Sequence, residues 1–290
     1  MPILILGSAG NLGGQLLKVF AKNDVIGWDR DDVDLLDSSE LKRRLDALAP
    51  EVIINAAAYN AVDRCESEEI EKDLAFLLNS SLPACLADYC LAAGALLIHY
   101  STDYVFGGDS RFSPAYQETD RPDPLNTYGA SKAAGEQEVA RRALLGLNYY
   151  LIRTSKLFGP KGNNPLAKPS FFDIMLEAAG KNTELKAVDA EMSCFTYTPD
   201  LAEATHALWE EKAPRGIYHL TNSGAATWYQ GAQELFRLSG SSVLVSPVGP
   251  DEWPRPAKRP AFSVLANTRR KPLRSWQEAL AEYLENRNKL

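Results

Sequence analysis

A tyrosine and a lysine four residues apart are the first pair in this 290-residue sequence whose types could do chemistry together. Tyr128 and Lys132 lie in PLNTYGASKAAGEQE, where a loop gives way to a helix-like pattern, and this spacing puts both side chains on one helix face. A free phenol, with a pKa of about 10, is a poor acid–base group at neutral pH. A neighbouring ammonium lowers that pKa, so the pair could exchange a proton with a carbonyl oxygen.

The strand that precedes this helix ends in hydroxyl groups. Residues 99–106 read HYSTDYVF, an apolar run that leads into Ser101 and Thr102. Ligands of open α/β sheets bind at the carboxyl ends of the strands, so Thr102 is expected to orient the oxygen that Tyr128 protonates. Alone, a tyrosine and a lysine at this spacing are usually two surface residues. The catalytic interpretation therefore depends on a cofactor site nearby, where Lys132 would also hold a ribose.

The first predicted strand runs directly into a glycine loop. Gly7, Gly10 and Gly13 give the spacing GxxGxxG, and such glycines let backbone N–H groups approach a pyrophosphate at a helix N-terminus. Asp29 ends the second strand about 20 residues further on, where a carboxylate binds the ribose hydroxyls of NAD and repels a 2′-phosphate. Arg30 partly offsets that preference, so NADH and NADPH both stay open. The alternative for Asp29 is a solvated turn carboxylate.

Short apolar runs alternate with helical patterns through the first half of the chain, which predicts βαβ units and a parallel sheet. The expected fold class is α/β, a Rossmann doubly wound sheet with a smaller, interleaved α/β substrate domain. We expect the NAD(P)-binding domain over residues 1–155, with later segments at roughly 170–182 and 217–240 packing back on it. Residues 156–290 are expected to form mainly the substrate domain.

Composition excludes several functional classes. The net charge of −7 argues against a nucleic-acid surface, and no apolar run approaches the roughly 20 residues that span a bilayer. The four cysteines lack zinc spacing and the three histidines do not cluster, so we predict no metal site. A cytoplasmic location, where thiols stay reduced, is the expectation.

The motifs resemble those of the dTDP-4-dehydrorhamnose reductase family, a group of extended short-chain dehydrogenase/reductases. They run in that family's order from residue 1 to about residue 276: GSAGNLG, DVDLLD, INAAAYNAVDRCESE, YSTDYVFGG, PLNTYGASKAAGE, LIRTSKLFG, TYTPDLA, GIYHLTNSGAATWY and RPAFSVL. The resemblance implies that NADPH or NADH delivers hydride to C4 of a dTDP-linked 4-ketosugar, giving dTDP-L-rhamnose. It also implies a monomer or homodimer.

The resemblance implies roles for individual residues. Those that match the family's catalytic residues are Thr102, Tyr128 and Lys132. The cofactor-binding positions, to which Asp29 and Arg30 belong by the argument above, are Gly7, Gly10, Asn11, Leu12, Gly13, Asp34, Leu35, Ala56, Ala57, Ala58, Tyr59, Tyr128 and Lys132. The positions expected to border the substrate are Val62, Asp103, Tyr104, Phe106, Lys156 and Arg259. The Arg259 guanidinium could bind a diphosphate through two hydrogen bonds, or it could be a surface loop residue.

Three segments depart from the family pattern, and all lie where substrate should bind. Lys156 replaces the usual aromatic residue after RTS, the sequence DAEMSCFT stands at 189–196, and GNNPLAKPSFFDIML carries unusual prolines. Some family members bridge a dimer through magnesium with a carboxylate on the first helix. Gln15 holds that position here, so we expect no such metal.

Three other functions are compatible with these motifs. One is a reductase of another nucleotide-linked 4-keto-6-deoxysugar. The second is a partner protein without catalysis, because the regulatory β subunit of methionine adenosyltransferase resembles the same fold and binds a dinucleotide. The third is an isolated NAD-sensing protein, which would bind cofactor but no sugar nucleotide.

Overall fold

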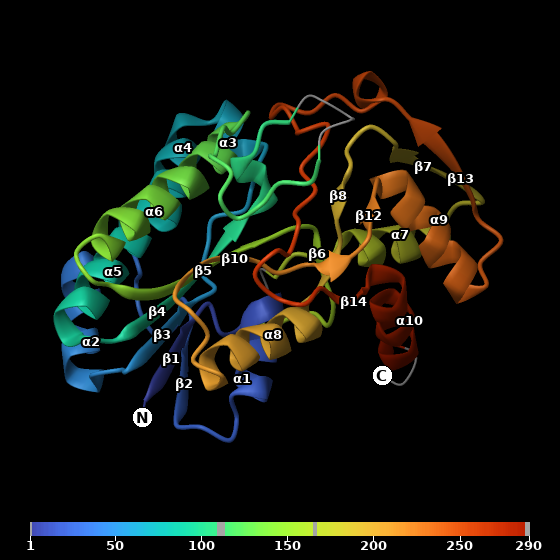
Figure 1. Cartoon of the computed structure of the whole chain (residues 1–290). Helices are drawn as coiled ribbons and strands as arrows, with labels where there is room; N and C mark the ends of the chain where they lie inside the picture. The colour runs from blue at the N-terminus through green and yellow to red at the C-terminus, as the bar shows by residue number, and fades with distance from the viewer. Residues whose placement is uncertain (1, 109–113, 165–166, 288–290) are drawn as a thin grey trace.

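Six parallel strands form the main sheet of the computed structural model, which describes residues 2–108, 114–164 and 167–287. The strand order is β10-β5-β4-β3-β1-β2 (Figure 1). The strands are β1 (Ile3–Leu6), β2 (Val25–Trp28), β3 (Val52–Asn55), β4 (Leu96–Thr102), β5 (Asn148–Thr154) and β10 (Gly216–His219). Chain order reverses direction at β1, which has β2 on one side and β3 on the other. This reversal opens a crevice at the carboxyl ends of β1 and β3.

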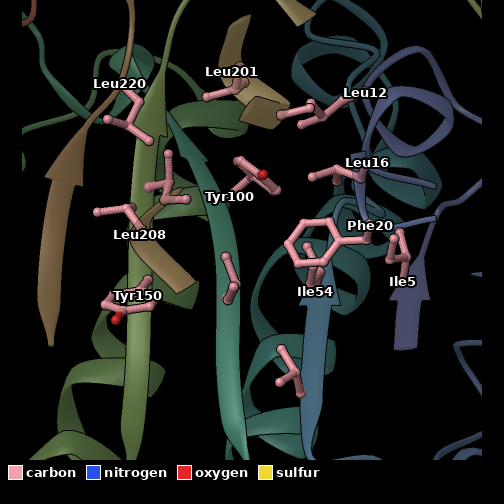
Figure 2. Packing of buried hydrophobic residues seen from close by; sticks show 14 of the residues in the cluster. Ile5, Leu12, Leu16, Phe20, Ile54, Tyr100, Tyr150, Leu201, Leu208 and Leu220 are labelled. Atoms are coloured by element: carbon pink, nitrogen blue, oxygen red, sulfur yellow. The ribbon is translucent and has the colours of Figure 1, made fainter. Parts of the chain in front are cut away.

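Helices cover both faces of this sheet, as its nearly unbroken apolar strands predict. On one face lie α1 (Asn11–Val19) and α8 (Thr198–Glu210), and on the other lie α2 (Ser38–Leu48), α5 (Leu82–Ala93) and α6 (Thr127–Ala143) (Figure 1). Figure 2 shows the first of these two cores, where Leu16 and Phe20 from the α1 side and Leu201 and Leu208 from α8 meet the sheet. The doubly wound α/β fold predicted from the sequence is confirmed.

One helical stretch bends around a π-turn. The helices α4 (Glu69–Phe76) and α5 are joined by η1 (Leu77–Ser81), a π-helix that brings the buried Asn79 side chain inward. The whole stretch, Glu69–Ala93, is long and apolar enough by length and composition to cross a membrane. Its α5 part instead contributes Leu82, Leu86 and Cys90 to the core beneath the sheet, as a core helix of a globular protein does.

The second half of the chain builds a smaller unit from short strand pairs and three helices. Its strands are β6 (Leu157–Phe158), β7 (Glu184–Val188), β8 (Ser193–Cys194), β9 (Thr196–Tyr197), β11 (Asn222–Ser223), β12 (Ala225–Ala226), β13 (Leu244–Val248) and β14 (Leu273–Ser275). Its helices are α7 (Phe171–Ala179), α9 (Trp228–Ser239) and α10 (Trp276–Arg287). The core is aromatic, with Phe158, Phe172, Phe195 and Trp276 all buried. The remaining short helices are α3 (Arg64–Ser67), η2 (Asp103–Val105) and η3 (Pro250–Glu252).

The later segments that pack on the main sheet are not the ones predicted. Residues 170–182, expected to pack on the first domain, form α7, whose Phe172 and Met175 lie in the aromatic core of the second unit. The segment 217–240 is divided, because β10 joins the main sheet while α9 packs in the second unit. The helix that does return to the sheet is α8. A domain boundary at residue 155 stays a prediction.

A buried ion pair fixes α6 to the main sheet. The Arg153 guanidinium of β5 donates to both carboxylate oxygens of Glu136 in α6, at 2.7 Å from Nη2 and 2.9 Å from Nε. Both side chains are nearly inaccessible, at 2% and 6% exposure. His219 of β10 also contacts Arg153, at 3.3 Å. The helix that carries Tyr128 and Lys132 is therefore held by a charge pair that water does not screen.

We predict that Glu136→Gln destabilises the protein strongly. The substitution keeps the side-chain shape but leaves the Arg153 guanidinium buried without a counter-charge, which costs about 3 kcal/mol or more. The measurement is the free energy of unfolding from urea titration followed by circular dichroism.

The matched control is Glu177→Gln, which breaks an ion pair with Lys181 whose side chains are 74% and 70% exposed. Such surface pairs contribute less than about 1 kcal/mol. Equal losses in the two variants would contradict a special role for the buried pair.

Candidate active site

The glycine loop lines a groove at the crevice between β1 and β3. Gly7 has a φ of 74°, in the left-handed region that glycine adopts readily. A Cβ on Gly13 would lie 2.0 Å from the Gly7 carbonyl oxygen, so only glycine fits at this position. Gly10 is the N-cap residue of α1 and offers no side chain to cap the first N–H groups of the helix. These N–H groups and the helix dipole make the start of α1 suited to an anion.

The groove has a volume of about 800 Å³ and collects most of the predicted cofactor residues. Those that line it are Gly7, Gly10, Asn11, Leu12, Gly13, Asp29, Arg30, Asp34, Leu35, Ala56, Ala57, Ala58 and Lys132. Tyr59 and Tyr128 do not line it. The groove reaches Ser101 and Thr154, whose buried hydroxyl groups have no hydrogen-bond partner within the described residues.

Tyr59 is not among the residues that line the groove, so its role at the cofactor stays a prediction. Its hydroxyl donates to Glu71 at 2.7 Å, and its backbone N–H and carbonyl both bond to the Asn79 amide at 3.0 Å. Burial and the Glu71 carboxylate raise the pKa of the Tyr59 phenol. Asn79 also donates to Ser131 of α6 at 3.0 Å. The π-turn therefore connects the end of β3 to the helix that carries Tyr128, a contact that no sequence pattern indicated.

Helix α6 approaches the end of β4 very closely. A Cβ on Gly129 would lie 2.2 Å from the Tyr104 carbonyl oxygen, so glycine is needed beside Tyr128. Asn126 caps the helix by accepting from the Gly129 N–H at 2.8 Å, and its amide donates to the Lys258 carbonyl at 2.8 Å. Asn126 was not predicted from the sequence, although asparagine is a preferred N-cap residue. Together these contacts bring Tyr128 to Thr102.

Tyr128 is half-buried between hydroxyl and aromatic neighbours. Its ring packs edge-on against Tyr104 with centroids 6.0 Å apart. Burial raises the pKa of Tyr128 to about 12, although its hydrogen bond with Thr102 acts in the opposite direction. The phenol is therefore protonated at neutral pH. Thr102 in turn accepts from the Tyr104 N–H at 3.2 Å, which fixes its hydroxyl at the start of η2.

Lys132 is held by a backbone carbonyl, and a lowering of the Tyr128 pKa by Lys132 stays a prediction. Its Nζ donates to the Tyr100 carbonyl at 2.6 Å, and it is not among the groups that shift the Tyr128 pKa. Burial lowers the pKa of Lys132 to about 8, while the Glu136 carboxylate acts in the opposite direction. The ammonium thus lies on the wall of the groove, where it can meet a ligand.

The predicted substrate residues fall into two groups. Asp103 is buried, accepts from Ser263 at 2.6 Å, and has its pKa raised by that burial. Tyr104 adjoins Tyr128, and Val62 lies half-buried in the loop after β3. Phe106, by contrast, is 0% exposed, stacks on Tyr116 at 4.1 Å and lies under the Arg153 guanidinium. Phe106 is therefore placed in the core, and its role beside the substrate stays a prediction.

Arg259 is held by a carboxylate rather than left free. Both its terminal nitrogens donate to Asp63, one of them at 2.8 Å, and Nη1 also donates to the Ala257 carbonyl at 2.7 Å. The Arg259 side chain is 10% exposed and the Asp63 side chain 39% exposed. This pair fixes the guanidinium at the edge of the loop after β3. A role for Arg259 at a diphosphate stays a prediction.

Lys156 lies in a cage of aromatic rings and carbonyl oxygens. Its backbone φ is 37°, and its Nζ donates to the carbonyls of Glu191 and Ala226, both at 3.1 Å. The ammonium also lies 4.2 Å from the Trp228 ring centroid and 5.0 Å from that of Phe195. Burial lowers the pKa of Lys156, while the Asp103 and Glu191 carboxylates oppose that shift.

The 189–196 loop supplies the anchor of this cage. Glu191 accepts from the Trp228 Nε1 at 2.9 Å and forms an ion pair with Arg255. Glu191, Trp228 and Arg255 were not predicted from the sequence, although the 189–196 loop was recognised as a departure from the family pattern. No local pattern could join them, because they come from three distant segments.

Fold and groove together define a nucleotide-binding α/β protein with a half-buried tyrosine at the carboxyl edge of its sheet. The model of the family described as "RmlD substrate binding domain" matches residues 1–289, and the chain therefore belongs to the dTDP-4-dehydrorhamnose reductase (RmlD) family.

Relatives cover almost the whole chain. It is 34% identical to the spore coat polysaccharide biosynthesis protein SpsK of Bacillus subtilis, over 99% of this chain and 98% of that protein. It is 38% identical to a dTDP-4-dehydrorhamnose reductase of Streptomyces griseus, over 96% and 91%. The solved dTDP-4-dehydrorhamnose reductase of Bacillus anthracis in complex with NADP superposes with a TM-score of 0.88 at 32% identity, over 98% and 99% of the two chains.

We predict that Lys132 makes the stability of the protein rise with pH above about 8. The pKa of Lys132 is about 8 in the folded protein, whereas an ordinary lysine, as in the unfolded chain, has a pKa of 10.5. Between these pH values the unfolded chain binds the proton and the folded chain does not, so folding becomes more favourable as the pH rises. Relative to Lys132→Met, the wild type should be stabilised by up to about 3 kcal/mol between pH 7.5 and 10.5.

The measurement is urea unfolding across this pH range, with Lys181→Met as the control because Lys181 is exposed. If the free energy of unfolding changes with pH in the same way for the wild type and Lys132→Met, the lowered pKa of Lys132 is contradicted.

Proposed function

We propose that the protein reduces the C4 ketone of dTDP-4-dehydro-6-deoxy-L-mannose to dTDP-L-rhamnose, with NADH or NADPH as hydride donor and Tyr128 as proton donor. The observation that carries the proposal is the half-buried Tyr128 phenol, bonded to Thr102 at the carboxyl end of β4 and close to the groove that Lys132 lines. Family membership supports it as well. The names of the relatives in Streptomyces griseus and Bacillus anthracis give the same reaction class.

The groove fits a dinucleotide in three respects. The uncapped start of α1 suits a pyrophosphate. The space that a Cβ would fill at Gly13 is taken by the Gly7 and Ser8 backbone, so the absence of a side chain lets the start of α1 pack tightly on the end of β1. The unpaired hydroxyl groups of Ser101 and Thr154 offer polar partners at the far end. We therefore assign NADH or NADPH as the cofactor, in agreement with the NADP bound by the Bacillus anthracis protein.

Proton transfer follows from the ionisation state of Tyr128. The cofactor, when bound, supplies hydride to the carbonyl carbon. The phenol is protonated at neutral pH, so it can donate to the carbonyl oxygen without first taking a proton from water. The Thr102 hydroxyl orients that oxygen, since its own position is fixed by the Tyr104 N–H. Lys132, held at the Tyr100 carbonyl, has further N–H donors for the cofactor ribose.

The substrate would lie between the loop after β3 and the 189–196 loop. Arg259, held by Asp63, supplies charge for the diphosphate. Tyr104 and Asp103 adjoin the reacting groups, and Lys156 supports the cage around Glu191 rather than offering an aromatic face. We keep the expectations of a cytoplasmic monomer or homodimer without a metal, nucleic-acid or membrane partner.

The other candidates differ in measurable ways. A reductase of another nucleotide-linked 4-keto-6-deoxysugar is favoured by Lys156, which stands where an aromatic residue is usual. A screen of dTDP-, UDP- and GDP-linked ketosugars with both cofactors separates it from our proposal. A regulatory subunit without catalysis would bind the dinucleotide and oxidise no NADH with any of these sugars.

We predict that Tyr128→Phe lowers kcat at least about 100-fold, because the substitution removes the proton donor. NADH oxidation with dTDP-4-dehydro-6-deoxy-L-mannose is the measurement, and the Kd for NADH should stay within about twofold. Tyr89→Phe is the matched control, since the Tyr89 hydroxyl bonds to the Leu45 carbonyl under α2. If Tyr128→Phe retains the wild-type kcat, the reductase mechanism is wrong.

We predict that Gly13→Ala weakens NADH binding by more than about tenfold. Its Cβ would push against the Gly7 carbonyl and displace the loop from the pyrophosphate position. Gly14→Ala is the control, because its Cβ would approach no closer than 3.9 Å to the Ser8 carbonyl oxygen. Fluorescence titration measures the Kd for NADH of both variants. Equal affinities for the two variants would argue against this loop as the cofactor site.

A further inference from the structure

A segment that follows β6 lies against the glycine loop, and its described residues are 162–164 and 167–168. The Gly162 N–H donates to the Asn11 side-chain oxygen at 2.8 Å. A Cβ on Gly162 would lie 2.3 Å from the Ala9 carbonyl oxygen. The two backbones therefore touch at the start of α1, which is the expected position of the pyrophosphate. Asn164, Ala167 and Lys168 line the same groove.

Asn164 contacts both the glycine loop and the ribose-binding carboxylate. Its backbone N–H donates to the Ala9 carbonyl at 2.9 Å, and its side-chain amide donates to the Asp29 Oδ1 at 3.0 Å. The other carboxylate oxygen of Asp29 accepts from the Ala9 N–H at 3.0 Å. Asp29 is thus held from two sides by different segments. An ionised carboxylate has about four acceptor positions, so it can still accept a ribose hydroxyl.

Lys168 extends across the mouth of the groove. Its carbonyl accepts from the Asn11 side-chain amide at 3.0 Å, so its backbone lies beside the N-terminus of α1. Its Nζ donates to the Asn60 carbonyl, beyond the end of β3, at 3.2 Å. Burial lowers the pKa of Lys168. The Arg64 guanidinium lowers this pKa as well, and the Asp63 carboxylate raises it. An ammonium has three N–H donors, and within the described residues only one of them has a partner.

We propose that Asn164 and Lys168 complete the dinucleotide site: Lys168 binds the cofactor pyrophosphate, and Asn164 positions Asp29 for the adenosine ribose. The proposal rests on the dinucleotide binding proposed above and extends it to a segment that none of the binding motifs covers. The glycine loop supplies N–H groups to the pyrophosphate but no cation. Lys168 adds a mobile charge, which suits an anion with several equivalent oxygens.

Fluorescence titration of NADH with the intact chain tests Lys168. We expect Lys168→Gln to raise the Kd about tenfold and Lys168→Glu to raise it further, because a charge-assisted hydrogen bond is lost and then replaced by repulsion. The effect should shrink at high salt. Lys161→Gln is the matched control in the same segment and should stay within about twofold of the wild type. Equal affinities for Lys168→Gln, Lys168→Glu and the control would overturn the assignment.

Fragments of the cofactor locate the contact. ADP-ribose, which keeps the pyrophosphate, should lose affinity for Lys168→Gln as NADH does. Adenosine, which lacks phosphate, should compete equally well for both proteins. A loss with adenosine of the same size would overturn the pyrophosphate contact and indicate a general distortion of the groove.

A double-mutant cycle on the Kd for NADH tests the positioning role of Asn164. Asn164→Ala should raise the Kd about fivefold in the wild-type background and have little effect in Asp29→Ala, because it acts through that carboxylate. Asn163→Ala, at an exposed neighbour, is the control. Additive effects would overturn the positioning role. If the wild type binds neither NADH nor NADPH, the proposed function itself fails, an outcome distinct from a wild type that binds and variants that do not differ.

Discussion

The contact between the backbone of Gly129 and the Tyr104 carbonyl is the constraint on which the proposed proton-transfer site depends. Only a residue without a Cβ lets the first turn of α6 come this close to the end of β4. The contact puts Tyr128 beside Thr102, and the buried pair of Arg153 and Glu136 holds the same helix further along. Moving α6 outward by one methyl group would separate the phenol from the hydroxyl that orients its target.

Local sequence predicted the parts of the site that a single turn or strand end can build. The glycine loop, Asp29 and the small residues Ala56, Ala57 and Ala58 all line the groove, because glycine spacing and strand ends determine where the backbone lies. The surroundings of Tyr59 and Phe106 were not predictable, for the opposite reason. The position of each residue depends on distant partners, which are Asn79 in a π-turn for the Tyr59 backbone and Tyr116 and Arg153 for the Phe106 ring.

The smaller unit was the least predictable part, because its strands are only two to five residues long and pair across large sequence separations. Lys156 illustrates this. In the sequence, Lys156 stands where an aromatic residue is expected. In the fold, its ammonium lies over the ring of Trp228, which belongs to α9. An aromatic ring is therefore present near this position, but it belongs to Trp228 and faces the Lys156 ammonium. Such an exchange between distant positions cannot be found from the spacing within either segment.

The high pKa of Tyr128 has a consequence for how the proposed proton donor is regenerated. In the proposed reduction each turnover leaves a phenolate in place of the phenol. Desolvation holds the pKa of Tyr128 at about 12, so this phenolate takes up a proton readily at neutral pH. Reprotonation returns the tyrosine to the form that the next ketone needs, while the equilibrium of the reaction stays a property of the substrates and the pH.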